Sequence, residues 1–181
     1  MCGRFTLTDM PFTLIRELGL FPPDFIPRYN IAPTQNSLVV IKEYRESPVF
    51  RSFRWGLIPV WAKDAGMAAR AINARAETVD EKPLFRDAFK SRRCLVPASG
   101  FYEWRADPSG KAKTPYYFTA APGVEPPVFA GLWERWRGAG EEIYSFTIIT
   151  TRANAFMAPF HDRMPVLIPR VHWERWLDPS V

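Results

Sequence analysis

Eighteen prolines are spread along the 181 residues of this chain, and they restrict it to short secondary-structure elements. Proline ends or kinks a helix, and the interior of a sheet excludes it because it cannot donate a ladder hydrogen bond. The hydrophobic content of 47% is nevertheless that of a globular chain with a core. The length suits one domain. No window offers the roughly 18 apolar residues of a membrane span, and the first ten residues lack the apolar stretch of a signal peptide.

The hydrophobic pattern predicts short strands joined by tight turns rather than a repeated strand–helix pattern. We expect strands over residues 38–42, 49–53, 94–96, 100–104, 114–119, 128–133, 143–150 and 166–168. We expect helices over residues 8–19, 84–91 and 171–177 and near residue 153, a loop over 62–70, and hairpin turns at 107–110 and 138–140. These elements predict an α+β fold for residues 1–181, a single compact domain with curled antiparallel strands in a barrel-like sheet and short flanking helices.

The sequence carries no recognisable cofactor or metal motif. It has no GxGxxG or Walker motif, so we expect no nucleotide cofactor. Its two cysteines and two histidines are scattered without a CxxC pair, so we expect no structural zinc site. Cys94 lies in the apolar run RRCLVP and is expected to be a buried structural thiol, and His172 of the last helix is assigned a structural role.

The charged residues are weighted towards arginine. Lys and Arg outnumber Asp and Glu by 24 to 19, for a net charge of +5, and 18 of the 24 cations are Arg. Aromatic residues make up 15% of the chain, including seven Trp. Arg binds phosphate and aromatic rings stack on bases, so this composition is compatible with binding single-stranded nucleic acid. The alternative is a modest positive surplus spread over a solvated surface.

Cys2 is a candidate for chemistry because of its position. Methionine aminopeptidase generally removes Met before a small residue, which would leave Cys2 with a free α-amine and a thiol on neighbouring carbons. An α-amine with a pKa of about 7.7–8.0 is nucleophilic near neutral pH. It can form a Schiff base with an aldehyde, and the thiol can then close a five-membered thiazolidine ring. The alternative is that Cys2 is an incidental residue in a frayed terminus. The next three residues argue against this alternative, because Gly3 gives a flexible joint, Arg4 a cation and Phe5 a buried anchor.

Glu103 is a second candidate, within the sequence Gly100-Phe101-Tyr102-Glu103-Trp104. In a strand, Phe101 and Glu103 share one face, and Tyr102 and Trp104 share the other. A carboxyl group flanked by aromatic rings can be desolvated, which suits it to general acid–base work. The alternative is a surface glutamate on the wet face of a sheet.

His161 and the segment 72–78 supply the remaining candidates. His161 lies in a loop braced by Pro159 and Pro165, and histidine is the side chain best suited to proton transfer near neutral pH. In the other segment, a strand would project Asn73, Arg75 and Glu77 from one face, with small alanines on the other. These three polar groups could form the floor of a pocket, and the alternative is an exposed loop.

Six segments together resemble the SOS-response-associated peptidase (SRAP) family, the abasic-site shielding proteins. They are residues 1–5 (MCGRF), 28–34 (RYNIAPT), 55–59 (WGLIP), 73–78 (NARAET), 100–104 (GFYEW) and 161–165 (HDRMP). Each segment is weak alone, but all six occur in the family's order and at its approximate spacing. The resemblance implies a compact mixed fold around curled antiparallel strands.

The resemblance also implies a covalent reaction with DNA. The protein would bind single-stranded DNA and link Cys2 to the ring-opened aldehyde of an abasic site as a thiazolidine. Asn73 would position the cysteine, Glu103 would help to protonate the leaving oxygen of the sugar, and His161 would contact the opened sugar and assist ring opening or reversal.

The resemblance implies that six further residues contact the DNA. Arg4, Arg75 and Arg163 correspond to cations that hold flanking phosphates. Trp61 corresponds to an aromatic residue near the DNA junction. The residues that correspond to the lining of the channel are Asn30 and Thr150.

The remaining expectations concern the state of the protein. We expect a monomer without metal or cofactor, cytoplasmic and associated with the nucleoid when bound to DNA. The family pattern continues past the last helix with another strand-like segment, which we expect to be missing here because the sequence ends at Val181. A retained Met1 would block the α-amine and prevent thiazolidine formation.

Two other functions use the same residues differently. In a cysteine-dependent peptidase, Cys2 would be the nucleophile with Glu103 or His161 as the base, and removal of Met1 would be its smallest reaction. In a non-catalytic single-strand binding module, Cys2 would be dispensable. The Arg and Trp content favours DNA as the partner over a peptide.

Overall fold

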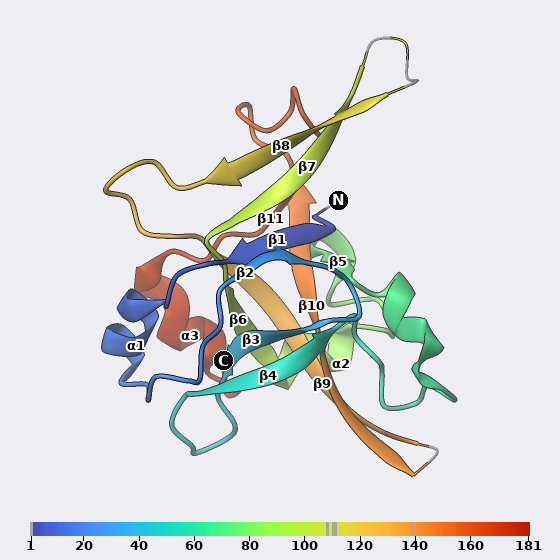
Figure 1. The fold of residues 1–181 in the computed structure, drawn as a ribbon. Helices are drawn as coiled ribbons and strands as arrows, with labels where there is room; N and C mark the ends of the chain where they lie inside the picture. Colours follow the sequence, from blue (N-terminus) through green and yellow to red (C-terminus); the bar gives the residue numbers. More distant parts are fainter. Residues whose placement is uncertain (1, 108, 110–111, 139) are drawn as a thin grey trace.

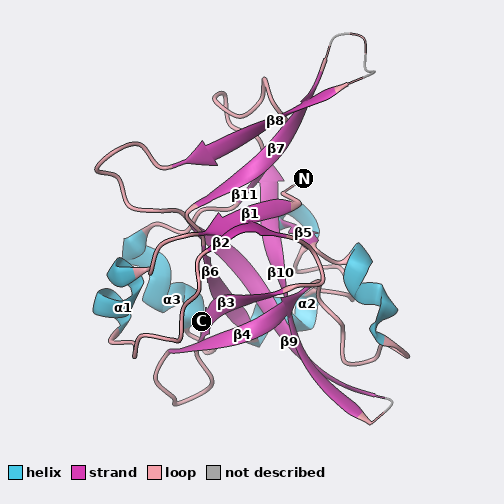
Figure 2. Cartoon of the chain, in the orientation of Figure 1, coloured by secondary structure: helices cyan, strands magenta, loops and turns pink. Residues whose placement is uncertain are grey.

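The computed structural model describes residues 2–107, 109, 112–138 and 140–181. Strands dominate these residues, and the helices are short (Figure 2). The strands are β1 (Arg4–Leu7), β2 (Arg28–Ile31), β3 (Asn36–Ile41), β4 (Val49–Trp55), β5 (Asn73–Arg75), β6 (Arg93–Pro97), β7 (Gly100–Ala106), β8 (Lys113–Thr119), β9 (Val128–Gly138), β10 (Glu141–Arg152) and β11 (Arg163–Pro165). The helices are α1 (Phe12–Leu18), α2 (Arg86–Ser91) and α3 (Trp173–Leu177), with 3-10 helices η1 (Ala65–Arg70), η2 (Ala76–Thr78) and η3 (Arg170–His172).

Five strands close into a barrel in the order β10-β4-β3-β6-β9, with β9 paired back to β10. A ring of five strands cannot alternate direction all the way round, so one pair must be parallel, and that pair is β4–β10. Closure leaves the ring without a free edge. The predicted barrel-like sheet is therefore confirmed, and parallel pairings of β10 with β4 and with β5 join the antiparallel ones that were expected.

A four-stranded antiparallel sheet, ordered β2-β1-β7-β8, lies above the barrel in Figure 1. Aromatic residues of its inner face pack on the barrel. The ring centroids of Phe5 in β1 and Trp55 in β4 are 5.1 Å apart, and those of Phe101 in β7 and Phe129 in β9 are 5.9 Å apart. Burial of these rings joins the two sheets around one core.

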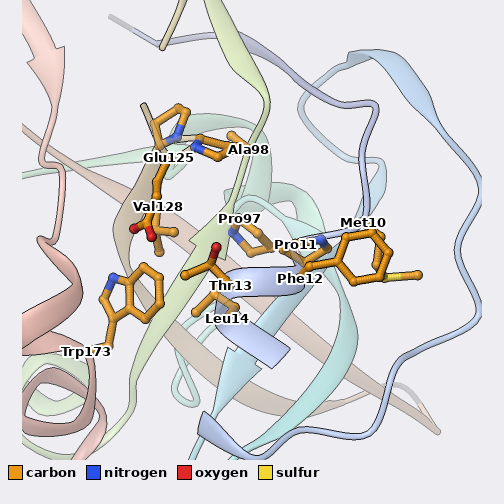
Figure 3. Close-up of a pocket in the computed structure, with 12 residues that line it drawn as sticks. Met10, Pro11, Phe12, Thr13, Leu14, Pro97, Ala98, Glu125, Val128 and Trp173 are labelled. Atoms are coloured by element: carbon orange, nitrogen blue, oxygen red, sulfur yellow. The ribbon is translucent and has the colours of Figure 1, made fainter. Parts of the chain in front are cut away.

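Helices α1 and α3 cover one side of the barrel, where Leu14 and Trp173 pack with Leu95 of β6. Gly19 ends α1 with a φ of 61°, a left-handed conformation that glycine adopts without strain and that the sequence pattern anticipated. An apolar hollow of about 250 Å³ lies between α1, β6 and α3 (Figure 3). In Figure 1 these helices lie away from the N-terminus.

Several expected elements are shifted or replaced. Residues 155–160 form turns where a helix was expected, α1 begins at Phe12, and η1 replaces part of the expected loop. The last strand is residues 163–165 rather than 166–168, because β11 pairs with the end of β10 and Leu167 makes only an isolated bridge. Strands β1 and β2 were not expected, since four-residue strands give too short a pattern.

Both expected hairpins are confirmed by their strand pairing. Of their turns, Pro108, Gly110 and Ala139 lie outside the described residues. None of the helices in the described ranges is long and apolar enough to cross a membrane.

Candidate functional site

Cys2 lies two residues before the start of β1, and its side chain is fully buried. Phe5, the anchor that the sequence predicted, is buried in the core three residues later. From Cys2 onward the terminus is therefore not frayed, whereas Met1 and its predicted removal lie outside the described residues. The Cys2 thiol is free, and burial raises its pKa, with the nearby charge of Glu103 raising it further. Both effects favour the neutral thiol over the thiolate.

Asn73 holds the backbone beside this thiol. It begins β5, which pairs with β10 through Ile148. Its side-chain Nδ2 donates a hydrogen bond of 2.9 Å to the carbonyl oxygen of Cys2. Its Oδ1 is buried and accepts no hydrogen bond from the described residues. Asn73 thus fixes the direction of the Cys2 backbone and offers one further acceptor close to it.

Glu103 lies on the inner face of β7 and is only 2% exposed. The alternative of a glutamate on the wet face is therefore wrong. The flanking Tyr102 and Trp104 face the other side of the strand, as the alternation predicted. The carboxylate acts on the Cys2 thiol through its charge and reaches His161, whose Nε2 is 4.0 Å from Oε2 of Glu103.

His161 lies in the loop between β10 and β11, with its side chain partly buried. The backbone N–H of Arg163 donates a hydrogen bond of 2.9 Å to Nδ1 of His161. Oδ1 of Asp162 is also 2.8 Å from Nδ1, but that side chain is exposed. Nδ1 is therefore engaged by the segment that follows His161, and Nε2 is the ring nitrogen that faces Glu103. The four predicted catalytic residues are thus brought together from distant segments.

Five of the six predicted DNA contacts form two groups. Arg4 and Asn30 lie together, with Nη1 of Arg4 donating a hydrogen bond of 2.9 Å to Oδ1 of Asn30. Arg75, Thr150 and Arg163 form the second group, because Thr150 of β10 is in register with both Arg75 of β5 and Pro165 of β11.

The guanidinium of Arg163 has partners within the protein. Nη1 and Nη2 donate to the two carboxylate oxygens of Glu77 at 2.7 and 2.9 Å, and Nη2 also donates to the carbonyl oxygen of Thr150 at 2.6 Å. The hydrogen bonds from Arg163 lower the pKa of Glu77 to about 2. Arg163 and Glu77 line an open hollow of about 590 Å³ together with Arg75 and Arg152. A phosphate there would share Arg163 with Glu77.

Trp61 lies in the segment between β4 and η1 and is 55% exposed, so its ring is available for stacking. The predicted DNA-contacting role of each of these six residues stays a prediction. Cys94 is fully buried, and burial raises its pKa, as expected of a structural thiol. His172 is exposed at the end of η3, so its assignment to a structural role gains no support from burial.

A family model described as SOS response associated peptidase (SRAP) matches residues 1–181. The chain belongs to the SRAP family. Abasic site processing protein YoaM of Bacillus subtilis is 44% identical over 185 residues, which cover 99% of this chain and 80% of YoaM. Abasic site processing protein HMCES of Xenopus tropicalis is 33% identical over 180 residues, 84% of this chain and 54% of HMCES.

Solved structures share the fold of this SRAP chain. A protein from Bacteroides thetaiotaomicron superposes with a TM-score of 0.84 at 28% identity, covering 99% of this chain and 82% of that one. A phage-related protein from Bordetella bronchiseptica gives a TM-score of 0.79 at 33% identity, covering 99% of this chain and 83% of that one. The barrel with its covering sheet is therefore an SRAP architecture.

The sequence did not reveal the pairing of Glu77 with Arg163 across 86 positions. Glu77 was placed on one face with Asn73 and Arg75, but no local signal links it to the segment after His161. The sequence also did not reveal that Phe160 packs on β8, with its ring 4.8 Å from that of Tyr116 and 5.1 Å from that of Phe118. This contact anchors the loop that carries His161.

Proposed function

We propose that this SRAP protein binds single-stranded DNA and forms a covalent thiazolidine between Cys2 and the ring-opened aldehyde of an abasic site. The observation that carries the proposal is the convergence of a buried Cys2 with Asn73, Glu103 and His161. Relatives named abasic site processing proteins support the choice of substrate.

The chemistry begins when Met1 has been removed. The α-amine of Cys2 adds to the aldehyde carbon, and loss of one water gives an imine. The thiol sulfur then adds to the same carbon, its proton is transferred to the imine nitrogen, and the thiazolidine ring closes. The aldehyde oxygen leaves as that one water, so the atoms balance without an oxidant, a reductant or a second substrate.

The neighbouring side chains have separate tasks in this sequence. The charge of Glu103 acts on the Cys2 thiol, and we assign to this carboxylate the transfer of the thiol proton to the nitrogen. Glu103 also helps to protonate the sugar oxygen when the ring opens, and His161, whose Nε2 faces Glu103, contacts the opened sugar and assists that step. Asn73 holds the Cys2 carbonyl so that the amine and the thiol approach one carbon from a fixed direction.

Arg4 and Arg75 supply the cations for the flanking phosphates, with Arg163 deeper in the same hollow as Arg75. Phosphates carry no sequence information, so binding should tolerate different sequences. On a single strand, the logarithm of the affinity should fall by about 0.7 per log unit of salt for each phosphate neutralised.

The proposal is tested by intact mass of the protein before and after mixing with a single strand that carries one abasic site. We expect loss of Met1 and a heat-stable adduct at the mass of protein plus DNA, less one water. Cys2→Ser keeps a small N-terminal residue with a free amine and removes the thiol, so it should give only a reversible imine. A heat-stable adduct of full yield in Cys2→Ser or Cys2→Ala would refute the thiazolidine.

Cysteine-dependent removal of Met1 is a second candidate, favoured by the family's description as a peptidase and by the carboxylate of Glu103 beside Cys2. It is tested with Glu103→Gln, which keeps Cys2 and therefore remains a substrate for methionine aminopeptidase. Retention of Met1 in that variant, with its loss in the parent, would assign the cleavage to the protein itself. Equal loss of Met1 in both would show that the removal does not require Glu103.

A further inference from the structure

The outer face of the sheet β2-β1-β7-β8 is not used by the reaction at Cys2. Strand alternation turns Phe101 and Glu103 inward, and it turns Tyr102 and Trp104 outward. The register places Arg4, Tyr102 and Tyr117 in one row across β1, β7 and β8. Trp104 follows in the next outward-facing row, and its ring centroid is 6.4 Å from that of Tyr102. The face therefore carries a continuous strip of three aromatic rings beside an arginine.

The rings of this strip are held in place before any ligand arrives. The hydroxyl of Tyr117 is 2.7 Å from the hydroxyl of Thr6, two strands away, so the ring lies across β7. A Cβ atom at Gly100 would come within 2.5 Å of that ring, which shows how closely it lies on the backbone. The Tyr102 hydroxyl likewise donates to the carbonyl oxygen of Tyr29 at 3.3 Å, again two strands away.

These rings are also accessible. Tyr117 is 45% exposed and Trp104 is 36% exposed. The ring centroids of Tyr102 and Tyr117 are 5.0 Å apart. Because their hydroxyl groups are engaged at the sheet, the rings present their faces rather than their polar tips. A pre-ordered aromatic face loses little conformational entropy on binding.

The charge of the face suits a polyanion. Arg4 lies at one end of the strip, and Lys113, in register with Ala106, lies at the other. This face carries no carboxylate among the described residues of β1, β2, β7 and β8. Arg4 is also two residues from Cys2, roughly 7 Å along an extended chain, so the face is continuous with the proposed site.

We propose that this aromatic face is a stacking surface for unpaired bases that neighbour the abasic nucleotide on the same single strand. Four-stranded sheets that bind single strands use the same combination of exposed rings and flanking cations. The surface would add affinity and keep the neighbouring bases unpaired while Cys2 reacts. The inference rests on the proposed function.

The test measures binding apart from chemistry. The probe is a labelled single strand whose central nucleotide is tetrahydrofuran, an abasic analogue without an aldehyde, and its dissociation constant is measured by fluorescence anisotropy. A second probe replaces the flanking nucleotides on both sides with tetrahydrofuran as well, so it keeps the phosphates and lacks the neighbouring bases. The variants are Trp104→Ala and Tyr117→Ala, each paired with a phenylalanine substitution that keeps a ring. Tyr44→Ala is the control, an exposed aromatic on the turn between β3 and β4.

We expect each alanine variant to bind the first probe about tenfold more weakly. On the second probe it should bind as the parent does, and its salt dependence should match the parent's because no phosphate contact is lost. The phenylalanine variants and Tyr44→Ala should stay within about twofold of the parent on both probes, because stacking needs only a ring.

An unchanged affinity in both alanine variants would overturn the inference, as would an equal loss on the two probes. A change of oligomeric state in the free alanine variants would assign the face to a second copy of the chain and would also overturn it. Failure of the proposed function can be told apart from failure of this inference. In that case the parent would form no adduct with an aldehyde-bearing strand at saturating protein. The anisotropy measurements would still decide the role of the face.

Discussion

The ion pair between Glu77 and Arg163 allows a quantitative test of how the hollow beside the site is stabilised. It joins η2 to β11 through two short, parallel hydrogen bonds of 2.7 and 2.9 Å, the geometry in which arginine binds a carboxylate most strongly. The perturbation is Glu77→Gln, which keeps the shape of the side chain and removes its charge. Nη2 of Arg163 keeps its bond to the carbonyl oxygen of Thr150 in the variant.

The magnitude follows from the lowered pKa. The pKa of Glu77 falls from an ordinary 4.5 to about 2, and at about 1.4 kcal/mol per pH unit this sets an upper limit of about 3 kcal/mol. The side chain of Glu77 is 39% exposed and that of Arg163 is 12% exposed. Solvent screening at such a site reduces the contribution, and we expect about 1–2 kcal/mol.

The sign of the pH dependence is fixed by the direction of that change. A carboxyl group with a lowered pKa in the folded state stabilises the fold above its ordinary pKa, and the contribution is lost as the pH falls towards the folded value. The parent should therefore be more stable than Glu77→Gln at pH 7 by about 1–2 kcal/mol. The difference should shrink steadily below pH 4.5 and approach zero near pH 2.

The assay is urea unfolding of the parent and the variant at several pH values between 7 and 3. Glu46→Gln is the matched control, an exposed glutamate between β3 and β4 that should change stability by less than about 0.5 kcal/mol. Two results would refute the reasoning. One is equal stability of parent and Glu77→Gln at pH 7, and the other is a difference that stays constant from pH 7 to pH 3.

Three further predictions concern the core and the loop. Gly131→Ala should lower stability by about 1–3 kcal/mol in urea unfolding, because its Cβ would lie 2.7 Å from Sγ of Cys94; unchanged stability would contradict this. Cys94 should resist alkylation by iodoacetamide in the native protein and react after denaturation, as followed by mass spectrometry, because burial raises its pKa. Phe160→Ala should slow crosslinking to an abasic site by about tenfold, because it releases the His161 loop from Tyr116. Phe160→Tyr keeps the ring and should keep the rate. Equal rates of crosslinking in the two variants would show that this contact does not matter.

Much of the local structure could be predicted from the sequence because it depends on neighbours along the chain. The period-2 alternation in the segment 100–104 placed Glu103 on the inner face and its aromatic neighbours outside. Gly19 marked the end of α1, and the apolar run around Cys94 marked a buried strand. The segments that carry the family resemblance identified Cys2, Asn73 and His161 before any contact between them was known.

The shortest elements could not be predicted reliably. Strands β1 and β11 contain four and three residues, too few to show a period, and each exists because a longer strand lies beside it. Strand β11 is defined by the end of β10, so it begins at Arg163 rather than three residues later. The turn that replaces the expected helix before His161 is similarly held by the packing of Phe160 on β8.

The class of fold, the family and the identity of the candidate residues could all be inferred from the order of amino acids. Which of those residues meet became known only from the folded chain. The hydrogen bond from Asn73 to Cys2 spans 71 positions, and the one between Thr6 and Tyr117 spans 111. Strands β8, β9 and β10 all lie between Glu103 and His161 in the sequence. Such contacts depend on strand order and register around a closed barrel, and local hydrophobic patterns specify the faces of strands but not which strands become neighbours.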